Sequence, residues 1–234
     1  MAKARSDDFK SPECRLSYAG GLFKARSAEA SARERYGCTL IFPKSARAEL
    51  EKIVAKVIVD EWGEKGIAKA KAGLIKSPFL AGDGKEAHNK TTGEIHPGLG
   101  PDVFFIRPTA NPDRPAPFVR WRDPNTQETE MTVYSGCYGK AVLNCFAWNN
   151  PQNGDGVSFG IVGFQKLRKG ESLGGSGGQA DPEKWMESVA DDGPIPESTQ
   201  NGAGAGGLFG DAPPKRAPAG ALFGGSLVDD DIPF

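Results

Sequence analysis

The last six residues of the sequence combine negative charge with an apolar end. Three consecutive carboxylates precede an isoleucine, a proline and a phenylalanine that carries a further carboxylate at the end of the chain. A basic pocket on another protein can hold such a group, which offers it both charge and an apolar anchor. The segment is too polar to fold alone, so we expect a protein-docking tip made of Asp229, Asp230, Asp231, Ile232, Pro233 and Phe234.

A second candidate site lies in a predicted strand from residue 131 to 148, where two kinds of residue alternate. Every second residue from Cys137 to Ala147 is small and apolar, which suits the inside of a barrel. The residues between them include rings and a cation, and single-stranded nucleic acid binds by stacking bases on rings beside cations. The alternative is that the larger rings pack inward. The predicted DNA-binding residues on this face are Tyr138, Lys140, Phe146 and Trp148.

Other predicted strands repeat the pairing of rings with basic groups. One run, Arg120-Trp121-Arg122, places a ring between two guanidinium groups that project to the opposite face of the strand. In the strand predicted at 33–42, Arg33 and Arg35 share one face. In the strand predicted at 157–167, Lys166 lies near the end. These segments add Arg35, Trp121, Arg122 and Lys166 to the predicted DNA-binding residues.

Catalytic and metal sites have little support in this sequence. The two histidines, His88 and His96, flank a glycine-rich loop and have no matching cysteine pair, so we expect loop histidines rather than zinc ligands. Asp102, Asp113 and Asp123 each lie beside a proline, where turn chemistry explains them. No nucleophile with a partner base is visible. We therefore expect no enzyme activity, no metal and no cofactor.

The four cysteines are Cys14, Cys38, Cys137 and Cys145, which are far apart and form no Cys-x-x-Cys pair. Free cysteines in apolar stretches usually act as small core residues. The first residues lack an apolar signal core, and no stretch approaches the length of a membrane span. We expect a cytoplasmic protein.

The charge distribution divides the chain near Gly170. Residues 1 to 170 carry 26 lysines and arginines against 19 acidic residues, a net charge of +7, whereas residues 171 to 234 carry 3 against 11, a net of −8. The second segment is also rich in glycine and proline and has too few large apolar residues to form a core. We predict a flexible N-terminus at 1–12, a folded domain at 13–170, a disordered linker at 171–228 and the tip at 229–234.

The pattern of apolar residues in the folded domain predicts strands with one helical insert. Apolar residues from Leu50 to Trp62 follow helical spacing, and a second helical piece is expected at 67–74. A glycine-rich loop should occupy 82–101. Five or more strands with one helix between them predict an OB-type barrel, and a β-sandwich with a helical insert fits the same pattern. The strands are predicted at 13–17, 33–42, 103–106, 118–122, 131–148 and 157–167.

The acidic run ending in Asp-Ile-Pro-Phe resembles the C-terminal tip of bacterial single-stranded DNA-binding proteins. The body, over about residues 13–172, resembles the single-stranded DNA-binding proteins of tailed bacteriophages. The resemblance rests on motifs that include Tyr36 to Lys44, Gly82-Asp83-Gly84, Tyr134 to Tyr138 and Gln165 to Leu167. It implies an OB fold with a helical insert and an acidic tail. Bacterial relatives lack this long helix, so their tetrameric state is not carried over.

Together, the residues and the resemblance predict a non-catalytic protein that coats single-stranded DNA during phage replication, recombination and repair. Binding should be independent of base sequence, because every base has a face that can stack. The tip is expected to recruit replication or repair proteins. The alternative is an adaptor or annealing mediator that acts mainly through protein docking, and a nuclease is a third possibility.

Overall fold

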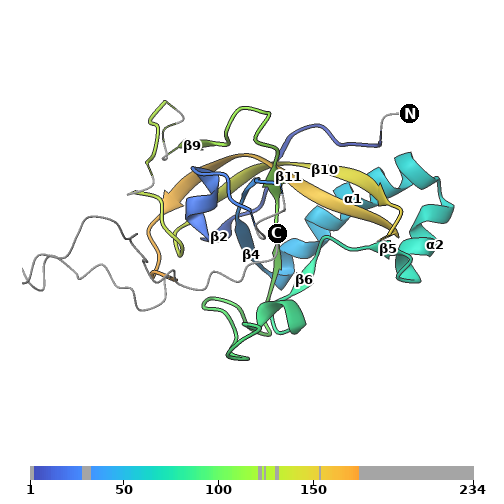
Figure 1. The fold of residues 1–234 in the computed structure, drawn as a ribbon, viewed down its shortest axis with the longest axis horizontal. Coiled ribbons are helices and arrows are strands. Elements are labelled where there is room, and N and C mark those ends of the chain that lie inside the picture. Colours follow the sequence, from blue (N-terminus) through green and yellow to red (C-terminus); the bar gives the residue numbers. More distant parts are fainter. Residues whose placement is uncertain are drawn as a thin grey trace, which may run out of the picture. The chain divides into compact units, whose positions relative to one another are not determined.

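The structure is a computed structural model, which describes residues 3–27, 33–120, 123, 125–129, 132–152 and 154–173. Its central feature is a long antiparallel ribbon of two strands, β10 (Tyr138–Asn150) and β11 (Gly154–Arg168), which pair along their whole length (Figure 1). The alternating residues of the sequence explain this element, because each strand buries one face and exposes the other. The expected strands at 131–148 and 157–167 are therefore confirmed, although the first begins only at Tyr138.

Short strands cover the two outer edges of the ribbon. Three of them run parallel to β11 at successive positions: β5 (Ile75–Lys76), β8 (Thr109–Ala110) and β9 (Phe118–Arg120). Along β10 lie β1 (Phe9–Lys10) and β2 (Cys14–Ser17), both antiparallel to it. The ribbon is thus the middle of a wider sheet, and its outer face is bordered by residues from distant parts of the chain.

The sheet continues from β2 through β4 (Thr39–Pro43) and β7 (Val103–Ile106) to β6 (Leu80–Ala81). At the other end, β3 (Tyr36–Gly37) pairs with β8. The mainly β fold with a helical insert is confirmed. Within the described residues the strand order is an open path from β3 to β6, so the sheet is not a closed barrel. These two end strands have only two residues each and do not pair with one another.

The helical insert follows β4, as the sequence predicts. It comprises α1 (Arg47–Trp62) and the shorter α2 (Lys65–Lys71), which lie at one end of the ribbon in Figure 1. Gly63 ends α1 with a positive φ of 67°, a conformation that favours glycine. Single 3₁₀ turns are found at η1 (Ala19–Leu22), η2 (Lys44–Ala46) and η3 (Lys85–Ala87). No helix in the described part of the chain is long and apolar enough to span a membrane.

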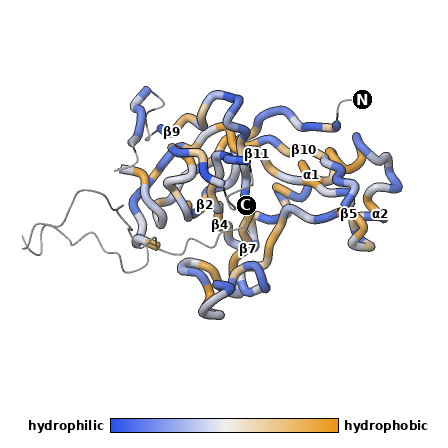
Figure 2. Tube along the Cα trace, viewed as in Figure 1, coloured by the Kyte–Doolittle hydropathy of each residue, from blue (hydrophilic) through white to orange (hydrophobic). Residues whose placement is uncertain are grey.

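The main core joins α1 to the inner face of the ribbon. Buried helix residues, among them Leu50, Val54 and Val57, share one cluster with Leu143 and Phe164 of the ribbon. Figure 2 shows hydrophobic segments along α1 and β7 beside more hydrophilic loops. All four cysteines are free and buried. Burial raises the pKa of the Cys145 thiol to about 12, which is consistent with a small apolar core residue.

The segment before β2 lies along the edge of β10. Ala4 accepts a hydrogen bond from the backbone N–H of Ala147, and the N–H of Ser6 donates to the carbonyl of Cys145. Glu61 of α1 anchors the start of this segment through the N–H of Ala4 at 2.7 Å. Residues 4–10 therefore border the outer face of the ribbon, within the stretch for which the sequence suggested flexibility.

Candidate nucleic-acid interface

The outer face of β10 carries the four residues that the sequence predicts for DNA binding. The side chains of Tyr138, Lys140, Phe146 and Trp148 all lie at the surface, partly exposed. The alternate residues Cys137, Ala141, Leu143, Cys145 and Ala147 are buried. The alternation expected for this strand is therefore confirmed.

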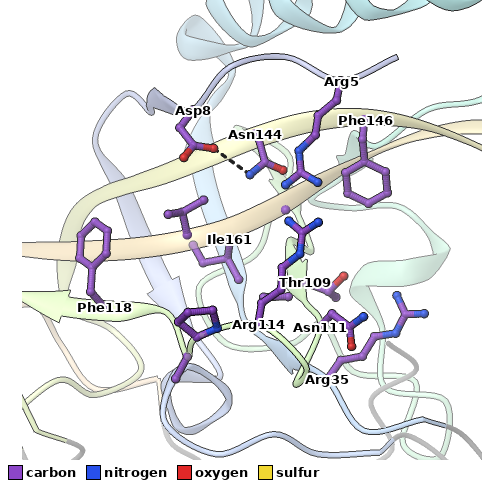
Figure 3. Close-up of a pocket in the computed structure, with 15 residues that line it drawn as sticks. Arg5, Asp8, Arg35, Thr109, Asn111, Arg114, Phe118, Asn144, Phe146 and Ile161 are labelled. Carbon is purple, nitrogen blue, oxygen red and sulfur yellow. Dashed lines mark hydrogen bonds between the residues drawn. The ribbon is translucent and has the colours of Figure 1, made fainter. Parts of the chain in front are cut away.

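A groove of about 680 Å³ opens on this face beside Phe146 (Figure 3). Its floor includes Asn144 and Gly160, and the rings of Phe118 and Phe146 lie on opposite sides of Asn144 in the view. Phe118 comes from β9 and is 40% exposed, which is unusual for so large an apolar side chain. The groove thus offers two rings on which flat, apolar groups can stack.

Three arginines from separate segments line the same groove: Arg5, Arg35 and Arg114. Figure 3 shows the side chains of Arg5 and Arg114 directed toward the middle of the groove and that of Arg35 at its edge. The guanidinium of Arg5 lies over the Phe146 ring, 5.9 Å from its centroid. None of the three forms an ion pair with another described residue, so their charges remain available to an anion.

Glycines of β11 allow large side chains to lie flat on the ribbon. Gly156 is paired with Trp148, and a Cβ at this glycine would collide with the indole ring. Gly163 is covered in the same way by Phe118, and Gly160 by the amide oxygen of Asn144. Each glycine leaves room for a close approach. The outer face therefore holds its rings against the sheet.

Trp148 is fixed more firmly than Phe146. Its indole N–H donates a hydrogen bond of 2.8 Å to the hydroxyl of Ser158 on β11. Lys76 of β5 is the parallel partner of Gly156 and is exposed, so a cation lies in the same row of the sheet. This end of the face again combines a ring with a positive charge.

Tyr138 lies at the other end of β10, between two arginines. The guanidinium of Arg168 is 3.6 Å from the centre of its ring and that of Arg15 is 5.6 Å away. Arg168 also forms an ion pair of 2.6 Å with Glu13. A smaller hollow of about 330 Å³ lies here, lined by the same four residues among others. The Tyr138 ring is thus more occupied by its own protein than the ring of Phe146.

Lys140 belongs to a row of polar side chains across three strands. It pairs with Gln165 of β11, which in turn pairs with Arg120 of β9. The guanidinium of Arg120 lies 6.0 Å from the centre of the Phe118 ring. This row connects the groove to the Tyr138 end of the face with two further cations.

Lys166 lies in the interior and not on this face. It is 5% exposed, and its ammonium donates a hydrogen bond to the backbone carbonyl of Thr132 and lies 5.5 Å from the centre of the Tyr134 ring. Simple alternation from Ser158 and Gly160 predicts that it points outward. The pairing shifts between Val142 and Leu143, which leaves one extra residue in β11, so every side chain after it points to the opposite face and Lys166 points inward. A second shift, between Tyr138 and Gly139, turns Arg168 outward again.

Arg35 is brought to the groove, as described, although it lies far from β10 in sequence. Trp121, Arg122 and the six residues of the tip lie outside the described residues. Sequence reasoning missed three members of the site, namely Arg5, Arg114 and Phe118. Phe118 alone had a usable signal, because it shares a strand face with Arg120 and flanks the buried Val119. The arginines are placed by long-range pairing, which has no local signal.

The described residues contain no group of three or more His, Cys, Asp or Glu side chains able to hold a metal ion. His96 is close to Tyr18, whose hydroxyl lies 3.4 Å from Nδ1. Partial burial, with the charges of Arg107 and His88, lowers the pKa of His96. A neutral imidazole in contact with a phenol is consistent with a structural role for this histidine.

Three solved structures that match this chain come from bacteriophages. The single-stranded DNA-binding protein of bacteriophage Enc34 in complex with single-stranded DNA has a TM-score of 0.52 and 19% identity, covering 74% of this chain and 96% of that one. A C-terminal truncation of the Enc34 protein has a TM-score of 0.50 and 19% identity, covering 74% and 94%. Gp2.5, a single-stranded DNA-binding protein encoded by bacteriophage T7, has a TM-score of 0.45 and 14% identity, covering 83% and 99%.

No curated protein matches this chain by sequence. A family model does match it, over residues 9–193, and is described as the single-stranded DNA-binding protein of Enterobacter phage Enc34. This range contains the whole sheet from β1 to β11 and every described residue of the groove except Arg5 and Asp8. The chain therefore belongs to the Enc34 family of phage single-stranded DNA-binding proteins.

Proposed function

We propose that this protein binds and coats exposed single-stranded DNA, in the host-cell cytoplasm, during phage replication, recombination and repair, without catalysing a reaction. The observation that carries the proposal is the outer face of the ribbon, where exposed rings lie beside arginines that have no ion-pair partner among the described residues. The solved complex of the Enc34 protein with single-stranded DNA supports it.

The geometry of the face favours a single strand over a duplex. Bases must be unstacked from one another to lie on Phe118, Phe146 or Trp148, and in a duplex their faces are already covered. The arginines and Lys140 supply charge for the phosphates along the same strand. Such contacts are common to all DNA sequences, so affinity should depend mainly on length and salt.

We infer that the acidic tip recruits replication or repair proteins. The sequence supports this, because three carboxylates and an apolar anchor match a basic pocket with an apolar floor. The same charges resemble a short run of phosphates, and a tether can raise their effective concentration near the DNA-binding face into the millimolar range. The tip should then compete weakly with DNA at low ionic strength.

Titration with labelled oligonucleotides tests the DNA-binding proposal. Single-stranded DNA should bind without being cleaved, duplex DNA of the same length should bind more weakly, and log affinity should fall with log salt by about 0.7 for each phosphate contacted. Equal or tighter binding of duplex would contradict the proposal. No detectable binding would favour the alternative, an adaptor or annealing mediator that works through protein docking.

Two changes at the tip separate docking from competition. Phe234→Ala should abolish capture of replication proteins in a pull-down and leave DNA affinity close to normal. Changing Asp229, Asp230 and Asp231 together to Asn should weaken the same capture and also tighten DNA binding at low salt, because the competing charge is removed. A tip deletion that alters neither readout would rule out both roles.

A further inference from the structure

Asp8 places a negative charge in a groove whose other charged residues are positive and attract phosphate. It is the only acidic residue among the described residues that line the groove, which also include three arginines. It forms no ion pair with any described residue, so no arginine of the groove is in direct contact with its carboxylate. A carboxylate in this position repels the DNA backbone. Its presence calls for a ligand group other than phosphate.

Asn144 holds this carboxylate in a fixed position. Its side-chain N–H donates a hydrogen bond of 3.0 Å to Oδ1 of Asp8, as Figure 3 shows. Asn144 is itself 2% exposed, and its amide oxygen has no hydrogen-bond partner among the described residues. The backbone around Asp8 is also fixed, because Ser6 and Lys10 on either side pair with β10. Asp8 is therefore presented to the groove in one orientation.

An ionised carboxylate only accepts hydrogen bonds, so its partner must be a donor. In single-stranded DNA the donors are on the bases: cytosine, adenine and guanine each carry an exocyclic amino group. Thymine and uracil carry none. Their one ring N–H lies between two carbonyl oxygens, which a carboxylate repels. Aspartate and glutamate accordingly pair with the amino group of cytosine where proteins read bases.

The position of Phe146 brings a base edge to this carboxylate. Phe146 is two residues from Asn144 on the same face of β10, a separation of about 7 Å. Figure 3 shows the Arg5 guanidinium between Phe146 and Asn144, so a base that stacks on this ring in place of Arg5 would extend one edge over Asn144 toward Asp8. We propose that Asp8, oriented by Asn144, gives the groove a preference for bases that carry an amino group. This inference rests on the proposed function, because it requires that single-stranded DNA occupies the groove.

Oligonucleotides of deoxycytidine and deoxyuridine, about 12 residues long, test this preference most directly. The two bases share ring size and differ at one ring edge, and the measurement is made at about pH 8, where cytosine is neutral. The full-length protein should bind the cytosine oligonucleotide about three to ten times more tightly, the net value of one hydrogen bond formed in exchange for water. Equal affinities, or tighter binding of uracil, would overturn the inference.

Asp8→Asn identifies the residue responsible. The new side-chain amide removes the repulsion and offers a donor to the carbonyl of uracil, so the ratio of affinities should fall to about one. Asp7→Asn is the matched control, since it makes the same change of charge on an exposed neighbour outside the groove. It should change both affinities alike and leave the ratio as in the wild type.

The outcomes separate this inference from the proposed function. If neither oligonucleotide binds, the proposed function fails and the base preference fails with it. If both bind equally, or if Asp8→Asn preserves the cytosine preference, DNA binding stands and the role of Asp8 is refuted. A preference lost in Asp8→Asn and kept in Asp7→Asn supports the inference.

Discussion

The inner and outer faces of β10 share one backbone and differ in what surrounds each side chain. On the inner face, Leu143 and its neighbours are fully buried against the helix and the opposite strands. On the outer face, Phe146 is partly exposed and is flanked by an arginine and a groove. Because adjacent residues of a strand point to opposite sides, stability and ligand binding can change independently in this strand.

The largest effect is expected from a change on the inner face. Leu143→Ala removes buried methyl groups and leaves a cavity, so it should lower the free energy of unfolding by about 2–5 kcal/mol. Chemical denaturation measures this. Below the denaturation midpoint, affinity for single-stranded DNA should stay near that of the wild type. A selective loss of affinity in the folded variant would show that the two faces are not independent.

A change on the outer face is expected to lower affinity for single-stranded DNA, by a smaller free energy, and to leave stability nearly unchanged. Phe146→Ala removes a ring on which a base can stack and should weaken binding of single-stranded DNA by about 1–3 kcal/mol. The thermal midpoint should hardly change, because the ring is partly exposed. Fluorescence anisotropy and a thermal melt give the two values. If the midpoint falls and affinity does not, Phe146 is a core residue and the face is misassigned.

On the outer face, Tyr138→Ala should weaken DNA binding less than Phe146→Ala does. The ring already lies between Arg168 and Arg15, so a base gains little from it, and we expect a loss below about 1 kcal/mol. The same titration used for Phe146→Ala provides the comparison. A loss as large as that of Phe146→Ala would mean that the arginines release the ring when DNA binds, and that the whole length of β10 stacks on bases.

Local patterns in the sequence predicted much of this fold. The alternation of β10 and the helical spacing of α1 are strong signals, and both elements are confirmed. The strand of Lys166 shows where such signals end, because a single extra residue in β11 turns its side chain from the surface to the interior. Nothing local marks that bulge. It depends on how two strands pair across the sheet.

The residues that line the candidate groove were predicted in part. Phe146 and Arg35 lie in the groove, as residues of the kinds that bind single strands. Arg5 and Arg114 reach it through pairing between distant segments, and no periodicity within those segments indicates their destination. Asp8 could not be recognised at all from its type or its neighbours. The role that we propose for it depends on a contact with Asn144, 136 residues away in the chain.

The glycines beneath the outer face also bear on how this family can evolve. Gly156, Gly160 and Gly163 each lie under a particular larger side chain, and a Cβ on any of them would strike that neighbour. A larger residue at one of these glycines therefore requires that the side chain above it move or change as well. In an alignment of relatives, each glycine and its partner should vary together. A relative with a larger residue at Gly163 and a small one at Phe118 would have exchanged a ring from one strand to the other while keeping a surface for DNA.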